Sequence, residues 1–219
     1  LGNVEAGFKY SIGLSLEELN ERWKKELKRE YWPEISLRED PEEFAKRLTD
    51  NKKVGGFYNT SPAISPQGDK VVFISDRDIY MDVYVMNTFD GEVIDKVIES
   101  GKTNDFEELN VLFPSLTWAP DNNRIALSRK SSGYDRIYIA DVEDGDGEDL
   151  PFELDGIESV SWSPDGKMLA LNGSNSQQSD IYVYNFETEE LINITNDIFS
   201  DYQPSWGSDN KSIFFASDR

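Results

Sequence analysis

A short motif occurs four times in the chain, and this repeat constrains the fold more than any other feature of the sequence. Each copy is centred on an apolar anchor that precedes a polar stretch, and the four anchors are Ile64, Trp118, Trp162 and Trp206. Successive anchors lie 54, 44 and 44 residues apart. Repeats of roughly forty to fifty residues are typical of β-propellers, in which each repeat forms a blade of four short strands.

A turn is predicted at a fixed distance after each anchor. Four residues beyond the anchors stand Gly68, Asn122, Gly166 and Asn210. Glycine and asparagine tolerate a positive φ better than other residues, so we expect a left-handed residue at this position of every repeat. Proline two residues earlier presets the turn in the first three copies, whereas the fourth copy has Ser208.

The apolar pattern predicts the strands of each blade. An apolar stretch opens seven residues after each anchor, and an alternating stretch follows at residues 82–85, 136–139 and 180–183. A further strand is expected over residues 92–98, 149–154 and 189–194. The chain is therefore expected to be mainly β, a partial propeller of about three and a half four-stranded blades with a short N-terminal α-helical segment.

The residues before the first repeat have helical patterning. Ser15 and Glu18 form a capping-box pattern, and apolar residues then recur at three- and four-residue steps. We expect Pro33 to end this helix. A second, shorter helix is predicted to follow, with Phe44 and Leu48 facing inward.

Charge is unevenly distributed, and the change marks an expected domain boundary. The net charge is −21, of which residues 1–60 contribute −1 and residues 61–219 contribute −20. We expect residues 1–59 to be a helical remnant or linker of an upstream domain, and residues 60–219 to be the blades. Because the blades are acidic, they repel nucleic acid and anionic membranes, and neither is expected as a partner.

The composition excludes several kinds of site. The chain has neither histidine nor cysteine. A Ser-His-Asp triad, a Cys-His pair and a zinc site built on imidazole or thiolate are therefore excluded within it. We expect no catalytic residue, no metal and no cofactor, and hence no enzyme activity of the chain's own. Membrane insertion is not expected either, since no apolar stretch reaches the roughly 18 residues that a span needs.

Binding is expected in loops at one end of the blades, because loops on a rigid scaffold carry function. In a propeller, this end holds the turns between second and third strands and the connections between blades. The candidates are Asp76, Arg77, Asp218 and Arg219 in the turns, and Asp105, Phe106, Glu107 and Glu108 in a long connection. A competing interpretation is that Asp76 and Arg77 pair locally and only order their own loop.

The third copy resembles the repeat of TolB-like β-propellers. Residues 159–167 and 180–183 match the pattern S-x-x-W-S-P-D-G-K followed later by D-I-Y-V. The resemblance covers residues 60–219, with departures at Ile64 and at Gly207-Ser208. It implies the propeller fold and says little about function. Because the family includes periplasmic scaffold proteins, the resemblance also implies a periplasmic or secreted location.

Similar repeats occur in two classes of peptidase. They form the propellers of prolyl-oligopeptidase-type serine peptidases and the C-terminal regions of bacterial envelope zinc metallopeptidases of the gluzincin type. Residues 8–23, with the pattern F-x-x-x-x-G-x-S-L-x-E-L-x-x-x-W, resemble the closing helix of such a metallopeptidase domain. The zinc-binding H-E-x-x-H of that family would lie upstream of Leu1.

Three and a half blades do not close a ring, which would leave apolar end surfaces without a neighbour. The chain could be a fragment of a longer propeller, pair with a second copy, or form an open arc on its N-terminal helices. We favour the fragment, and expect the isolated chain to associate with itself through its open edges.

These features favour a non-catalytic, protein- or peptide-binding module of a bacterial envelope protein. The alternatives are a substrate-docking propeller of a zinc metallopeptidase, the propeller gate of a prolyl-oligopeptidase-like serine peptidase, and a pure scaffold. The flanking sequence would discriminate among them. An upstream H-E-x-x-H supports the first alternative, a downstream G-x-S-x-G the second, and neither motif the third.

Overall fold

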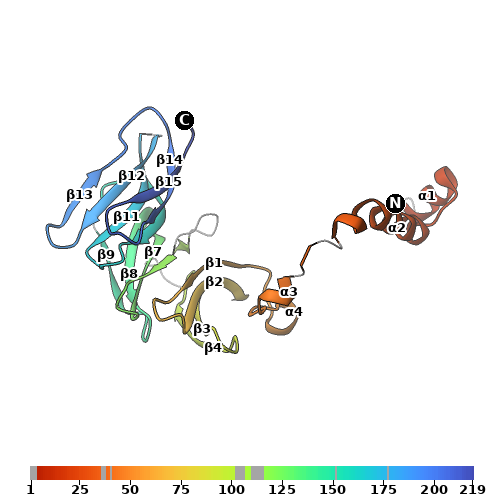
Figure 1. Ribbon diagram of the computed structural model, residues 1–219, viewed down its shortest axis with the longest axis horizontal. Helices are drawn as coiled ribbons and strands as arrows, with labels where there is room; N and C mark the ends of the chain where they lie inside the picture. The colour runs from red at the N-terminus through yellow and green to blue at the C-terminus, as the bar shows by residue number, and fades with distance from the viewer. Residues whose placement is uncertain are drawn as a thin grey trace. The chain divides into compact units, whose positions relative to one another are not determined.

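Two units make up the chain (Figure 1). The computed structural model describes residues 4–35, 38–39, 41–101, 107–109, 116–150, 152–176 and 178–219. The first unit is Leu1–Arg47 and the second is Leu48–Arg219. The described elements of the first unit are helices, and those of the second are β-strands apart from one short helix.

Two helices of the first unit are separated by a glycine. α1 spans Val4–Ile12 and α2 spans Leu16–Ile35, and Gly13 between them has a φ of 71°. The predicted capping box at the start of α2 is confirmed. The Glu18 N–H donates to Ser15 Oγ at 3.1 Å, and the Ser15 N–H donates to Glu18 Oε2 at 2.9 Å.

Two expectations for this unit are wrong. α2 does not end at Pro33 but continues to Ile35. A proline in the last turn removes one backbone donor and leaves the preceding turns intact. Phe44 does not face inward but is 70% exposed. Its helix, α3 (Pro41–Phe44), is a single turn and so cannot present a repeated apolar face.

Leu48 and a short helix begin the second unit. α4 (Asn51–Val54) is capped by Asp50, whose carboxylate accepts the Lys52 N–H at 3.0 Å. Leu48 faces inward as predicted, since it packs against the buried cluster of Phe73, Tyr84 and Met86.

The second unit contains three antiparallel blades and a further two-stranded sheet (Figure 1). Blade 1 comprises β1 (Asn59–Ile64), β2 (Lys70–Asp78), β3 (Tyr80–Asn87) and β4 (Val93–Ile98). Blade 2 comprises β6 (Leu116–Trp118), β7 (Arg124–Ser131), β8 (Tyr134–Asp141) and β9 (Gly147–Leu150), and β5 (Glu108–Leu109) also pairs with β7. Blade 3 comprises β10 (Gly156–Trp162), β11 (Met168–Asn175), β12 (Gln178–Asn185) and β13 (Glu190–Asn193). The start of blade 4 pairs β14 (Asp201–Trp206) with β15 (Ile213–Ser217). The predicted mainly β architecture of propeller blades is confirmed.

The last strand of blade 2 begins earlier than expected. It was predicted over residues 149–154, whereas β9 is Gly147–Leu150 and pairs Leu150 with Ile137. A tight turn with Gly145 at a φ of 75° starts the strand early. Phe152 and Leu154 therefore leave the sheet and pack against the apolar cluster between blades 2 and 3.

The predicted left-handed turn is present in all four repeats. The φ angles are 74°, 65°, 77° and 56° at Gly68, Asn122, Gly166 and Asn210. The core also follows the repeat, because the aliphatic residues nineteen positions after the first three anchors are fully buried: Val83, Ile137 and Ile181. Trp118 and Trp162 are buried anchors, whereas Ile64 is 64% exposed.

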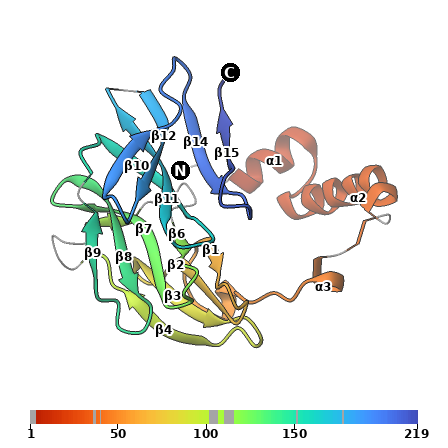
Figure 2. The same ribbon diagram turned by 60° about the vertical axis from the view of Figure 1, so that its left-hand side comes forward.

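Neighbouring blades contact one another through their inner strands. β1 lies against β6, β6 against β10, and β10 against β14 (Figure 2). Hydroxyl groups one residue before the anchors link these strands. Thr117 Oγ1 accepts the Trp162 N–H at 3.4 Å, and Ser161 Oγ accepts the Trp206 N–H at 3.2 Å. The repeat therefore specifies contacts between blades as well as the blades themselves.

Candidate partner-binding site

Asp76 holds the segment that enters the first blade. It lies with Arg77 inside β2 rather than in a loop, because β2 continues through an irregular pairing with β3. Asp76 Oδ1 accepts the N–H groups of Phe57 at 2.8 Å and Tyr58 at 2.9 Å. The carboxylate therefore has a structural task at the start of β1.

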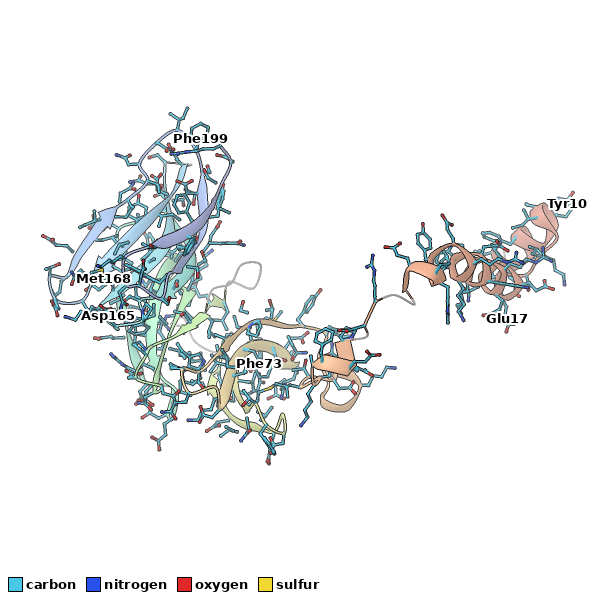
Figure 3. The ribbon with its side chains drawn as sticks, in the orientation of Figure 1. Tyr10, Glu17, Phe73, Asp165, Met168 and Phe199 are labelled. Atoms are coloured by element: carbon cyan, nitrogen blue, oxygen red, sulfur yellow. The ribbon has the colours of Figure 1, made fainter. Side chains whose placement is uncertain are left out.

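Arg77 stacks on two aromatic rings of the same blade. Its guanidinium carbon lies 4.7 Å from the ring centroid of Tyr84 and 5.1 Å from that of Phe73, which is labelled in Figure 3. The Lys96 ammonium approaches the Tyr84 ring as well, at 5.5 Å. All three contacts have the geometry of cation–π interactions, which hold the two cations in place.

A charged network near Arg77 was not predicted. The Lys96 ammonium lies 2.7 Å from Asp78 and 3.0 Å from the buried Asp82, and the Tyr84 hydroxyl donates to Asp78 at 3.0 Å. The hydrogen bond to Asp78 raises the pKa of Lys96, and burial is the main cause of a raised pKa at Tyr84. These residues come from three strands and are brought together by the strand register. The register could not be read from the sequence, so the network was not predicted.

Asp218 and Arg219 have partners like those of the pair in blade 1. Asp218 Oδ1 accepts the Ser200 N–H at 2.8 Å, in the connection that enters β14. The Arg219 guanidinium lies 5.4 Å from the ring centroid of Phe199 and pairs with Asp197. The Phe199 N–H and then Arg219 lower the pKa of Asp197. Asp218 and Arg219 thus contact the connection that enters β14 and hold it in place.

The structure describes part of the long connection between blades 1 and 2. Asp105 and Phe106 lie outside the described residues. Glu107 Oε2 accepts the Gly133 N–H at 3.1 Å, in the turn between β7 and β8, and Glu108 belongs to β5. The described candidates therefore belong to blades 1, 2 and 4. In each blade they lie at the end that carries the turn between second and third strands, and these ends were predicted to share one face.

This end of the blades exposes large apolar side chains. They lie in turns between second and third strands, at the first residue of a third strand, or in segments entering inner strands: Phe57, Tyr58, Ile79, Tyr80, Tyr134 and Ile198. Ile79 is 87% exposed with a φ of 89°, a strained conformation for a β-branched residue. At the opposite end of blade 1, Ile64 and Phe89 are exposed as well. The six side chains of the first end are termed the apolar end.

Two pockets share the residues that lead from blade 2 to blade 3. Both are lined by Phe152, Glu153 and Leu154. One, termed the inter-blade pocket, has a volume of about 350 Å³ and is also lined by Tyr182, Tyr184, Glu189 and Leu191. Its neighbour, of about 460 Å³, adds Tyr134, Asp135, Arg136 and Asp155. Sequence reasoning missed both pockets because it assigned residues 152–154 to a strand.

The candidate residues, the apolar end and the two pockets can offer a ligand polar and apolar contacts. In the described ranges, no three His, Cys, Asp or Glu side chains gather as a metal site requires. Of the helices that the structure describes, none is long and apolar enough to cross a membrane.

Solved structures share the fold at low sequence identity. TolB from Acinetobacter baumannii superposes with a TM-score of 0.60 at 21% identity, covering 72% of this chain and 37% of that one. A putative TolB from Agrobacterium tumefaciens has the same TM-score and identity, covering 74% of this chain and 54% of that one. Hydrazine synthase from Kuenenia stuttgartiensis gives 0.54 at 15% identity, covering 71% and 42%. The chain thus spans between about a third and a little over half of these proteins.

The sequence itself matches one family. The model of the TolB beta propeller domain matches residues 109–219, which is half of the chain. No curated protein matches the chain. The matched half contains the buried tryptophan anchors, three of the four left-handed turns and the aliphatic strands of blades 2 and 3. The chain therefore belongs to the TolB β-propeller domain family.

Proposed function

We propose that this chain is a non-catalytic, protein- or peptide-binding propeller module of a bacterial envelope protein, in the periplasm or secreted. The apolar end is the observation that carries the proposal. Apolar side chains exposed together on a rigid scaffold mark interaction sites, and aromatic residues are enriched in interfaces. Asp76, Glu107 and Asp218 lie at the same end of their blades and would contribute the polar rim.

Two substitutions in the full parent protein test this proposal. Ile79 and Phe89 are equally prominent, at 87% and 86% exposure, but lie at opposite ends of blade 1. We expect Ile79→Asp to abolish co-purification of a stoichiometric protein partner, because a charge would have to be buried in the interface. We expect Phe89→Asp to retain the partner. Loss with both variants, or with neither, would contradict the proposal.

A second candidate function is substrate docking for a zinc metallopeptidase domain. The first unit favours it, because α1 has no buried residue and Tyr10 (Figure 3) and Trp23 are 94% and 61% exposed. Exposed apolar side chains on helices are suited to packing against a further domain. Proteolysis by the parent protein that a zinc chelator abolishes would support this function. A parent without an encoded H-E-x-x-H motif would reject it.

A further inference from the structure

The inter-blade pocket has a fixed aromatic wall. Tyr182 and Tyr184 alternate along β12 and so share one face of blade 3, where Leu191 of β13 is the cross-strand partner of Tyr184. The Phe152 ring lies edge-on to that of Tyr184, with 5.1 Å between centroids. Because both tyrosines are buried in blade 3, this wall does not depend on a mobile side chain.

Gly173 allows the connecting segment to approach this wall. A Cβ atom at residue 173 would lie 2.5 Å from Leu154 Cδ1, so glycine makes the close packing of Leu154 possible. Phe152 and Leu154 are therefore both anchored on blade 3. Glu153, between them, is held at the pocket by its two neighbours.

Two glutamates line the pocket without a neutralising partner. Glu153 and Glu189 are both exposed lining residues. Among the residues that the structure describes, none forms a hydrogen bond or ion pair with either carboxylate. The charge of Glu189 reaches the wall: burial is the main cause of a raised pKa at Tyr184, and the charges of Glu189 and Glu148 raise that pKa further.

We propose that the inter-blade pocket binds a lysine or arginine side chain, together with an adjacent apolar residue, from an extended segment of a protein partner. Aromatic faces attract a cation, and the aliphatic stem of lysine or arginine packs well on apolar walls. The two carboxylates supply the charged hydrogen bonds for the head group. An acidic partner is disfavoured by the same charges.

The neighbouring pocket extends this surface for a longer segment. Asp135 and Asp155 line it, and its one cation, Arg136, has its Nε 4.0 Å from Asp149 Oδ2. A basic segment that continues past Glu153 would therefore meet further carboxylates. Tyr134 in the neighbouring pocket belongs to the apolar end, whereas the inter-blade pocket contains none of its six residues. Substitutions in the inter-blade pocket therefore test this proposal independently of the apolar end.

Calorimetry with a model peptide tests the proposal on the chain as it stands. The probe is acetyl-Ala-Lys-Leu-Lys-Ala-amide at low ionic strength, and its counterpart has glutamine in place of both lysines. The pocket variant is Glu153→Gln with Glu189→Gln. The control variant, Glu92→Gln with Glu143→Gln, makes the same change of net charge elsewhere on the blades.

We expect the lysine peptide to bind, the glutamine peptide to bind much more weakly, and added salt to weaken the complex. The pocket variant should bind the lysine peptide roughly tenfold more weakly than the unaltered chain, while the control variant should bind it equally well. An equal loss in both variants would show unspecific attraction to an acidic surface and overturn the proposal. Undiminished binding by the pocket variant, or no binding by the unaltered chain, would overturn it as well. Neither result would bear on partner binding at the apolar end.

Discussion

Asp76 and Asp218 stand twelve residues after the anchors of their repeats, and both accept N–H groups six residues before those anchors, from Tyr58 and Ser200. An arginine follows each aspartate and stacks on a nearby ring. The recurrence of Ser-Asp-Arg thus has a physical reason, because each carboxylate fixes the entry of an inner strand. It also places a cation beside aromatic rings at the end where partner binding is proposed.

The tether at Asp76 requires a glycine opposite it. Gly56 has a φ of 75°, and a Cβ atom there would lie 2.6 Å from Asp76 Oδ1 and 3.0 Å from the Arg77 backbone. Gly68 has nearly the same φ, 74°, with nothing within 4 Å of its Cβ position. We expect Gly68→Ala to lower the free energy of unfolding by about 1 kcal/mol through backbone strain alone. Gly56→Ala should lower it by at least about 1 kcal/mol more, because it also displaces the tether.

Urea denaturation of the two alanine variants measures this difference. Because Gly56 and Gly68 have nearly equal φ angles, Gly68→Ala is the matched control for backbone strain. Equal loss of stability in both variants would show that the contact with Asp76 contributes nothing.

At the scale of elements, the turn after the anchor also joins one blade to the next. Asn122 Oδ1 accepts the Gln67 N–H at 3.1 Å, and Asn210 Oδ1 accepts the Asp165 N–H at 2.9 Å (Asp165 is labelled in Figure 3). These asparagines hold the left-handed conformation and bond to the preceding blade. Glycine at the equivalent position provides only the conformation.

Substitution of Asn122 separates its two roles. Asn122→Gly keeps the left-handed turn and loses the hydrogen bond to Gln67, so we expect a loss of about 1 kcal/mol in the free energy of unfolding. Asn122→Ala loses the bond and strains the turn, and should cost about 1 kcal/mol more. Thermal or urea unfolding gives both values. A glycine variant less stable than the alanine variant would refute this division of roles.

The elements that the sequence predicted well are those determined locally. Gly68, Gly166 and the two asparagines encode their turns in a few residues, and the buried strands follow at fixed offsets. The errors arose where distant contacts decide. β9 begins early because of the turn at Gly145, and residues 152–154 leave their blade to pack on the next one. The inter-blade pocket depends on that packing, so no pattern within one repeat could reveal it.

For the molecule as a whole, β15 presents an apolar strand edge. Among the described strands, it pairs with β14 alone, and Phe214 and Phe215 are 67% and 42% exposed. An exposed apolar strand edge favours pairing with another chain. The prediction that the isolated chain associates with itself therefore has a candidate surface.

Sedimentation velocity over a range of concentrations tests this association. We expect the isolated chain to form larger species as its concentration rises, and Phe214→Lys to weaken the association roughly tenfold by removing apolar contact area. Phe89→Lys is the control, because Phe89 is also exposed but lies in the turn between β3 and β4. A chain that stays monomeric at all concentrations would contradict the prediction.

Site-specific photo-cross-linking in the full parent protein can show whether the apolar end is the partner-binding face of this propeller. A photo-reactive amino acid would replace Ile79, Ile198 or Phe89 in turn. We expect a discrete adduct with the same partner protein from positions 79 and 198, and no such adduct from position 89. An adduct from position 89 but from neither of the other two would contradict the claim.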